Sequence, residues 1–368
     1  MRKIIPILMA CALTGAALTG CGSAGSETPA ISTDSESSES SAGSEPSESS
    51  AGTAVSTDAA DASQQEGETT DKTVLRIGAL KGPTSMGLVS LMDQSDASPN
   101  QYQFTMASAA DELTAGIAGK DLDIALVPAN VASVLYSKTN GGVSVIDINT
   151  LGVLYVVSGD TSIQTPEDLS GKTIYMTGKG TTPDYVMHYI LEAQDTPVTD
   201  VAFEYKSEPA EVAAVLKENP DAIGLLPQPF ATVACAQNDK LSQVMDLTEQ
   251  WDLLQGGSGS RLVTGVTIVR NDFLKEHEDA VKEFMAEHRL SAQAASDDPE
   301  RVANLVVEAG IIEKAPIAQK ALPYCSITYI DGQEMKDALS GYLNVLFSQD
   351  PASVGGSLPA DDFYYMAQ

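Results

Sequence analysis

The clearest pattern along this chain is a short aliphatic run that ends at a proline and opens into helical spacing. It occurs at residues 123–132 (DIALVPANVA) and again, 99 positions later, at residues 222–231 (AIGLLPQPFA). A short apolar run followed by a turn residue predicts a buried strand, a turn and a helix. The amphipathic segments before both runs keep the same spacing, with Glu112 matching Glu211.

A second pair of matching segments lies one unit earlier in the sequence. Residues 75–84 and 173–182 each read as a strand, then Lys-Gly, then Thr and a helix, at a spacing of 98. Three successive elements in the same order indicate an internal duplication, and common strand–helix patterning without duplication is the alternative. Strands that alternate with helices predict an α/β fold with mostly parallel sheets flanked by helices.

The duplication predicts two similar lobes with a cleft between them. Open sheets of this kind bind ligands beyond the carboxyl ends of their strands. Two closely spaced aliphatic segments, at 143–148 and 152–157, suit one crossing of the chain between the lobes, and the segment 264–269 suits the return.

These crossings set the expected lobe boundaries. We expect lobe 1 to comprise residues 73–152 and 266–368, and lobe 2 to comprise residues 153–265. The tail of the chain should pack on lobe 1, with helical patterns at 277–295, 300–309 and 334–347.

The start of the chain has the features of an export signal. A positively charged pair at positions 2 and 3 precedes an apolar run of about 14 residues, which is shorter than the roughly 20 that a bilayer span needs. The Leu-Thr-Gly-Cys ending at 18–21 resembles a bacterial lipobox, in which the cysteine is acylated. We therefore predict a lipoprotein signal peptide at 1–20 and lipidation, such as palmitoylation, of Cys21. An ordinary signal peptide with a chance cysteine is the alternative.

The segment after Cys21 has the composition of a tether. Residues 22–72 are mostly Ser, Glu, Asp, Ala, Thr and Gly, with eleven acids and one lysine. Such a segment cannot bury enough apolar surface to offset its ordering entropy. We therefore predict that residues 21–72 form a lipidated cysteine followed by a disordered, acidic, serine-rich linker.

The net charge of the chain argues against some classes of binding partner. The net charge of −30 includes +2 from Arg2 and Lys3 and −10 from the linker, which leaves −22 for the folded part. A surface this acidic argues against nucleic acid and against general binding to anionic lipid. Solubility explains the charge, and attraction of a cationic ligand is the alternative.

The sequence offers no catalytic or metal-binding grouping. Cys235 and Cys325 remain after the signal and the lipidation site, and their separation resembles neither a metal site nor a disulfide framework, so we expect free thiols. The histidines His188, His277 and His288 are scattered among helical patterns. We therefore predict no enzyme activity, no cofactor and no metal.

Two predicted strand-to-helix turns carry the most chemistry. The turn at 178–185 has two glycines that permit unusual φ, Thr182 as a helix N-cap and Pro183 at the first helical position. The turn at 81–86 offers similar parts. Backbone N–H groups and the positive end of a helix favour an anion there. Ordinary capped helices with solvated lysines are the alternative.

Other residues near these turns complete the predicted site. Asn130 and Gln228 could orient a ligand, and Tyr155 and Tyr185 could supply apolar walls, although a core position explains each aromatic residue equally well. Trp251 is expected to be packing rather than ligand contact. The predicted ligand-binding set is Lys81, Gly82, Pro83, Thr84, Ser85, Pro128, Asn130, Tyr155, Lys179, Gly180, Thr181, Thr182, Tyr185, Gln228 and Pro229.

These motifs resemble those of a known family. GALKGPT at 78–84, VPAN at 127–130, TGKG at 177–180 and LPQP at 226–229, together with the lipobox and the serine-rich stalk, look like the type II solute-binding proteins of ABC importers. The most similar branch is the one for nitrate, sulfonate, taurine and thiamine precursors. The resemblance covers about 73–368 and says little about the solute.

The resemblance implies a binding function without catalysis. Together with the lipobox, it implies a receptor that is lipid-anchored at the extracytoplasmic face of the cell membrane and captures a small molecule between two lobes. We expect a monomer and, from the chemistry of the two turns, an anionic or polar aromatic solute. The resemblance also implies delivery of that solute to an ABC permease. Two alternatives stay open: a surface sensor or adhesion lipoprotein, and an enzyme of the pyrimidine-synthesis type on the same scaffold.

Overall fold

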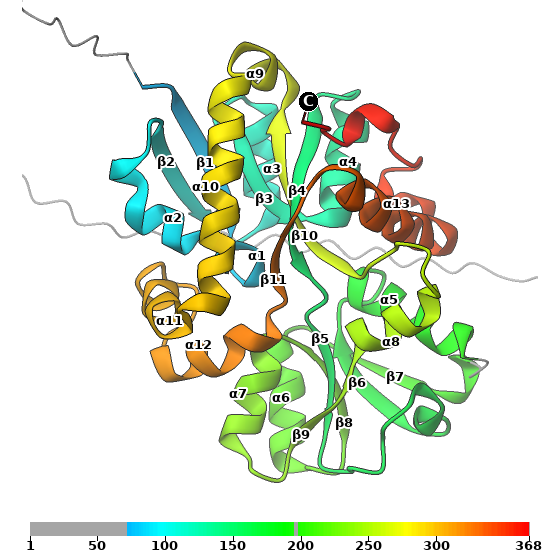
Figure 1. Ribbon diagram of the computed structural model, residues 1–368. Coiled ribbons are helices and arrows are strands. Elements are labelled where there is room, and N and C mark those ends of the chain that lie inside the picture. The colour runs from blue at the N-terminus through cyan, green and yellow to red at the C-terminus, as the bar shows by residue number, and fades with distance from the viewer. Residues whose placement is uncertain (1–71, 195–197, 368) are drawn as a thin grey trace, which may run out of the picture. The chain divides into compact units, whose positions relative to one another are not determined.

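The computed structural model describes residues 72–194 and 198–367 (Figure 1). The predicted signal peptide, the lipidation site at Cys21 and the linker up to residue 71 lie outside the described residues, so these remain predictions.

The first sheet has six strands in the spatial order β11–β4–β10–β3–β1–β2. β1 pairs in parallel with β2 and β3, whereas β10 pairs antiparallel with both β3 and β4, and β11 pairs antiparallel with β4. We call the part of the molecule built on this sheet lobe 1. Its strands are β1 Val74–Leu80, β2 Gln101–Ala107, β3 Ile124–Pro128, β4 Val143–Leu151, β10 Val263–Arg270 and β11 Ile327–Ile330.

The second sheet has five strands in the order β7–β6–β8–β5–β9 and forms lobe 2. β6 pairs in parallel with β7 and β8, whereas β5 pairs antiparallel with β8 and β9. Its strands are β5 Leu154–Ser158, β6 Thr173–Thr177, β7 Ala202–Lys206, β8 Ile223–Pro227 and β9 Ser242–Asp246.

The two sheets share one topology. In each, three parallel strands stand in the order second, first, third, and the next position is an antiparallel strand that the chain forms on crossing between the lobes. The predicted α/β architecture of two helix-flanked sheets is therefore confirmed. The sheets are mixed rather than mostly parallel, because β4, β5, β9, β10 and β11 all make antiparallel pairs.

Helices cover both faces of the first sheet because alternate residues of its strands face opposite sides. In β3, Ile124 and Leu126 pack with Phe284 of α10, whereas Ala125 and Val127 belong to the core that contains α3 and α4. Within the described residues no helix is long and apolar enough to cross a membrane. The helices are α1 Pro83–Met86, α2 Val89–Gln94, α3 Ala110–Ala118, α4 Ala129–Lys138, α5 Thr182–Ala193, α6 Pro209–Glu218, α7 Phe230–Gln237, α8 Leu247–Gln255, α9 Asn271–Glu276, α10 Glu278–Asp297, α11 Pro299–Glu308, α12 Ala315–Ala321 and α13 Gly332–Gln349.

The pairing registers correct the predicted spacing between residues 75–84 and 173–182. Ile77 pairs with Ile124 in lobe 1, and Ile174 pairs with Ile223 in lobe 2. Since Ile124 and Ile223 are 99 positions apart, the equivalent residues of β1 and β6 are Ile77 and Ile174, which are 97 apart. The predicted spacing of 98 is wrong by one residue, a shift that would exchange the two faces of the strand.

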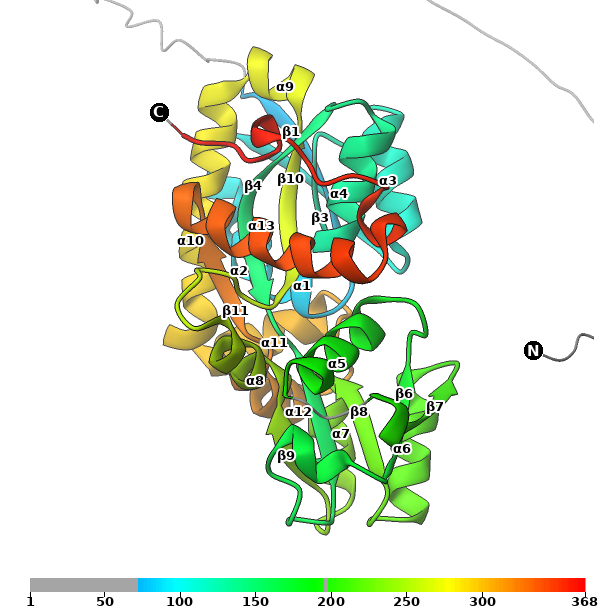
Figure 2. The ribbon, with the colours of Figure 1, turned by 90° about the vertical axis from the view of Figure 1, so that its right-hand side faces the viewer.

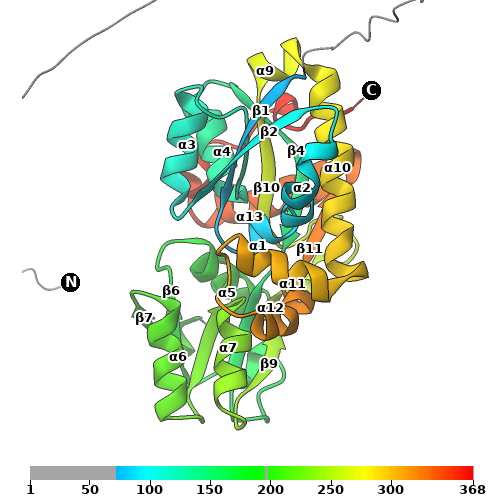
Figure 3. The same cartoon turned by 90° about the vertical axis from the view of Figure 1, so that its left-hand side faces the viewer.

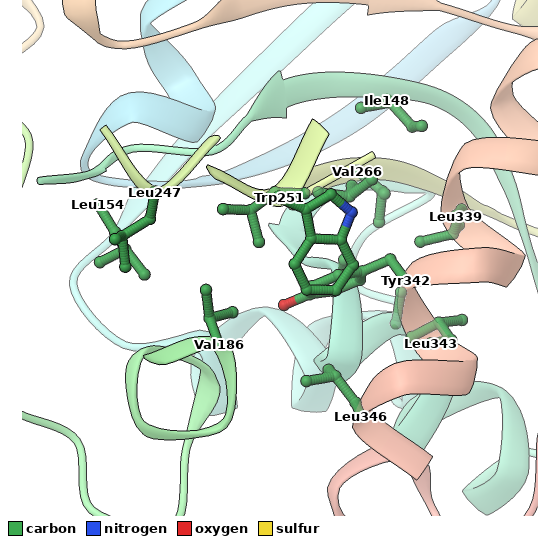
Figure 4. Close-up of a cluster of buried hydrophobic side chains, with 14 of the residues drawn as sticks. Ile148, Leu154, Val186, Leu247, Trp251, Val266, Leu339, Tyr342, Leu343 and Leu346 are labelled. Carbon is green, nitrogen blue, oxygen red and sulfur yellow. The ribbon is translucent and has the colours of Figure 1, made fainter. Parts of the chain in front are cut away.

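One apolar cluster runs from lobe 1 into lobe 2, and Trp251 of α8 lies within it (Figure 4). The Trp251 side chain is completely buried. Its ring centroid lies 4.8 Å from that of Tyr189 on α5 and 5.7 Å from that of Tyr342 on α13. The expectation that Trp251 is a packing residue is confirmed, and the packing joins the two lobes.

We expect Trp251→Ala to lower the free energy of unfolding by about 3–5 kcal/mol, because truncating a buried aromatic leaves a cavity that its neighbours fill only in part. Urea denaturation followed by circular dichroism measures the change. Leu253→Ala on the same helix is the matched control: Leu253 is 72% exposed, so its truncation should change stability by about 0.5 kcal/mol or less. Equal effects of the two substitutions would contradict the assignment.

Candidate functional site

The pairing registers place the carboxyl ends of the central strands at the boundary between the lobes. Gly265, near the start of β10, pairs with Pro128 at the end of β3. Leu154, the first residue of β5, pairs with Pro227 at the end of β8. Because β10 and β5 begin where the chain enters each lobe, these ends face the other lobe. β1 runs parallel to β3, and β6 to β8, so the turns after all four strands share this boundary, where Figures 1 and 3 show α1 and α5.

The turn from β6 into α5 depends on two glycines. Gly178 has φ 80° and Gly180 has φ 70°, the left-handed region that favours glycine. The Thr181 hydroxyl donates a hydrogen bond back to the Gly178 carbonyl at 2.6 Å. No side chain caps α5, which begins at Thr182 with Thr181 as its N-cap, one residue earlier than the predicted cap.

A buried carboxylate occupies part of the predicted anion site in this turn. Asp184, in the first turn of α5, accepts hydrogen bonds from the Gly180 N–H at 2.8 Å and from the Tyr205 hydroxyl at 2.5 Å. Burial, together with the hydrogen bond to Asp184, raises the pKa of Tyr205. The positive end of α5 therefore already stabilises a negative group of the protein itself, which opposes a ligand anion at the same position.

The turn from β1 into α1 differs from the predicted helix start. α1 has only four residues, so its helix dipole is small and attracts an anion only weakly. Gly82 has φ 141°. Thr84 and Ser85 are buried, and their hydroxyls donate to the carbonyls of Leu80 and Gly82 at 3.1 Å each. These two side chains hold the turn together from within.

The two lysines of the predicted set lie on different sides of the boundary. Lys81 is exposed, and its Nζ lies near Gly310, in the connection between α11 and α12. Lys179 is exposed, with its Nζ 5.4 Å from the centre of the Tyr205 ring. Within residues 72–194 and 198–367, neither lysine forms an ion pair.

Helices α4 and α7 follow the equivalent strands β3 and β8. They begin after Pro128 and Pro229, and the N-cap residue of neither forms a side-chain capping bond. Asn130 is half-buried, and its Nδ2 donates to the Ser353 carbonyl at 3.4 Å. Gln228 is 1% exposed; its Oε1 accepts from the Thr232 hydroxyl at 2.8 Å. Gln228 Oε1 also accepts from the Thr232 N–H, in the first turn of α7, at 3.4 Å, so Gln228 supports the start of α7 from within. Within the described residues, the N–H groups of Phe230 and Ala231 and those of the first turn of α4 have no side-chain partner.

Both tyrosines of the predicted set contact the tail of the chain. Tyr155 is 5% exposed, and its hydroxyl donates to the Tyr324 carbonyl at 3.1 Å. Burial raises the pKa of Tyr155. The Tyr185 hydroxyl donates to Asp350 Oδ2 at 2.8 Å, and burial together with this bond raises the pKa of Tyr185 to about 12. These bonds connect lobe 2 with the segments after α12 and α13.

A pocket of about 640 Å³ lies between α5 of lobe 2 and α13 of lobe 1. Of the fifteen predicted ligand-binding residues, Tyr185 is the one that lines it. The lining residues are Tyr185, His188, Tyr189, Glu192, Ala193, Ser348 and Gln349.

Sequence reasoning missed several residues at the boundary. Asp184, Tyr324 and Asp350 all contact predicted residues. Asp184 left a local signal, an acid in the first turn of a helix that follows a glycine turn, which is typical of an N-terminal capping carboxylate. No local sequence signal marks Tyr324 or Asp350, because their hydrogen-bond partners, Tyr155 and Tyr185, are 169 and 165 residues away in the sequence.

The cysteines and histidines of the described residues are dispersed over both lobes. Cys325 is buried and Cys235 half-buried, both as free thiols, and burial raises the pKa of Cys325 to about 12. His288 is buried beside Asp147 in lobe 1, and His188 lies 3.6 Å from Asp184. Within the described part of the chain, no three His, Cys, Asp or Glu residues are placed to hold a metal ion.

Comparison with known proteins matches both the sequence and the fold. Residues 142–302 match the family model described as NMT1/THI5 like. No curated protein matches the chain. The fold is similar to a crystal structure of an ABC transporter protein from Parabacteroides distasonis, with a TM-score of 0.67 and 24% identity, over 81% of this chain and 100% of that one.

Two further solved structures share the fold. The periplasmic aliphatic sulphonate-binding protein SsuA from Escherichia coli has a TM-score of 0.62 and 13% identity, over 76% of this chain and 94% of its own. The ligand-binding component of an ABC-type import system from Staphylococcus aureus, with zinc bound, has a TM-score of 0.57 and 15% identity, over 80% and 97%. The fold is that of type II periplasmic binding proteins, and the resemblance stated from the sequence is confirmed.

We expect Asp184→Ala to destabilise the protein by about 1–3 kcal/mol, because it leaves the Gly180 N–H and the Tyr205 hydroxyl without their charged partner. Chemical denaturation measures the difference. Glu192→Ala, which removes an exposed acid from the same helix, is the control and should have little effect. If the two variants were equally stable, Asp184 would not support the turn.

Proposed function

We propose that this protein is an extracytoplasmic, lipid-anchored solute-binding protein that captures a small molecule between its lobes and delivers it to an ABC permease. The observation that carries the proposal is the position of the four equivalent turns. The strand exchange brings the ends of β1, β3, β6 and β8 to one boundary, where a ligand can contact both lobes at once.

The chemistry of this boundary favours a polar solute. In the described residues the first N–H groups of α4 and those of Phe230 and Ala231 in α7 have no side-chain partner, and Asn130 lies in the first turn of α4. Lys81 and Lys179 are exposed and without ion pairs in the described residues, so they add positive charge around the boundary rather than a fixed contact. This combination suits an anionic or polar aromatic solute held chiefly by backbone donors.

The transport role is taken from the chain's resemblances. Of the solved structures with the same fold, one is described as an ABC transporter, one as a periplasmic aliphatic sulphonate-binding protein and one as the ligand-binding component of an ABC-type import system. The lipobox-like ending at Cys21 and the acidic linker would hold such a receptor at the outer face of the membrane as a monomer. The lobe boundaries that we propose are 73–152 with 266–368, and 153–265, of which the last falls within β10, a strand that begins at Val263.

The two alternative functions would give different experimental results. A sensor or adhesion lipoprotein would bind a partner protein and leave the boundary between the lobes without a small ligand. An enzyme of the pyrimidine-synthesis type would convert its ligand, so mass spectrometry would find the bound compound changed after incubation. A transport receptor returns the compound unchanged.

Isothermal titration calorimetry over organic acids, sulfonates, pyrimidines and amino acids tests the proposal, together with native mass spectrometry of compounds carried from the producing cell. We expect at least one compound to bind with micromolar affinity, about −8.2 kcal/mol. Folded, ligand-free protein that binds nothing across this library would contradict the proposal.

With a ligand identified, we expect Asn130→Ala to weaken binding roughly tenfold, the effect of losing one ligand hydrogen bond in a water-poor site. Asn304→Ala is the matched control, because Asn304 is an exposed asparagine on α11 whose amide bonds only within its own helix. Calorimetry on both variants measures the difference. If both variants bound the ligand equally well, Asn130 would not be a ligand-binding residue, and the transport role would still be possible.

A further inference from the structure

Helix α13 joins the two lobes by two kinds of contact. It belongs to lobe 1 by its contacts with β4 and β10, and it also contacts α5 of lobe 2 (Figure 2). At its middle, Tyr342 packs on Trp251, and the two side chains are 1% and 0% exposed. This part of the contact is apolar and dry, so separating it would expose a large apolar area to water.

The C-terminal end of α13 meets α5 through polar groups. Gln349 Nε2 donates to the Tyr185 carbonyl at 3.0 Å, and the Tyr185 hydroxyl donates to Asp350 Oδ2 at 2.8 Å. Asp350 Oδ1 accepts from the Ala352 N–H at 2.9 Å, which fixes the carboxylate. A single tyrosine of lobe 2 is thus bonded at both its backbone and its side chain to adjacent residues of lobe 1.

These polar bonds border open space. Tyr185 and Gln349 line the pocket of about 640 Å³ between α5 and α13. Water in such a pocket can replace either hydrogen bond when the helices separate, so breaking them costs far less than opening the contact at Trp251. The contact between the lobes is therefore strong at the middle of α13, whereas at the C-terminal end of α13 water can readily replace its hydrogen bonds.

We infer that Tyr185, Gln349 and Asp350 form a latch that holds the two lobes in the arrangement seen here, with the Trp251–Tyr342 contact as the pivot. Tyr185 acts as a positioning residue between the lobes rather than as a wall for the ligand. A latch of this kind sets the populations of the latched and unlatched forms, and so the fraction of the protein ready to bind.

Hydrogen–deuterium exchange on the full, ligand-free chain tests the latch. Tyr185→Phe keeps the ring and the backbone carbonyl and removes only the hydroxyl bond. We expect amides in residues 182–186 and 346–350 to exchange roughly fivefold faster than in the wild type, the effect of one lost hydrogen bond on local opening. Amides in residues 335–343, around the pivot, should keep their protection.

Two variants make the test specific. Tyr189→Phe is the matched control on α5, because the Tyr189 hydroxyl accepts a hydrogen bond from Gln255 and none from α13, and exchange at 346–350 should stay at the wild-type rate. Asp350→Asn retains an acceptor oxygen for Tyr185 without the charge. Its exchange should lie between those of the wild type and Tyr185→Phe.

Two results would overturn the inference. The first is an exchange pattern for Tyr185→Phe that equals that of Tyr189→Phe, since the hydroxyl bond then holds nothing. The second is a uniform rise across 335–350, because the bond would then be part of the general packing of α13. No ligand is used, so failure here leaves the proposed transport function standing, and failure to find a solute leaves the latch standing.

Discussion

The structure depends on the way each sheet is completed by a strand that arrives from the other lobe. β5 follows the crossing from β4 and pairs with β8, and β10 follows the return and pairs with β3. Because both arriving strands are antiparallel to their neighbours, the carboxyl ends of the parallel strands must face the partner lobe. Trp251 lies just before the return crossing and packs against α13, so the apolar core continues through the crossing. The position of the candidate site and the continuity of the core both follow from this exchange.

Much of the fold could be predicted because its signals are local. The repeat at 123–132 and 222–231 corresponds to the equivalent units β3–α4 and β8–α7, and the three helical patterns in the tail overlap α10, α11 and α13. Each signal rests on apolar periodicity within one segment, which survives whatever the segment later packs against. The predicted spacing between β1 and β6 is wrong by one residue because it rests on the Lys-Gly pairs, which lie in the turns and not in the strands. The turn into α5 differs in length from the turn into α1, so the turns and the strands have different spacings.

The details of the candidate site could not be predicted, because side-chain directions there are set by distant segments. Lys81 lies by Gly310, and Tyr185 bonds to Asp350; neither partner is near in sequence. The helix predicted after the Lys-Gly turn at 81–82 is only the four-residue α1, and a separate helix, α2, follows it. A helix start that looks like an anion site in sequence can be only four residues long, or can already hold a carboxylate such as Asp184.

Buried polar groups of the protein hold two of the four boundary turns, the one from β1 into α1 and the one from β6 into α5. In lobe 1 the Thr150 hydroxyl lies 2.9 Å from Asn149 Oδ1 and 3.4 Å from the Pro83 carbonyl, so it can donate to either. Asn149 Nδ2 donates to Thr267, whose hydroxyl donates to Asp147, and all of these residues are almost completely buried. Such a network is costly unless every member is satisfied, and once satisfied it fixes one geometry. The Asp184 carboxylate has the same role in lobe 2.

These hydrogen bonds hold each turn in one conformation without a ligand. For the receptor that we propose, the adjustment on binding a solute then falls to the relative position of the lobes. Closing the lobes would add contacts to the solute without the entropy cost of ordering the backbone of the turns.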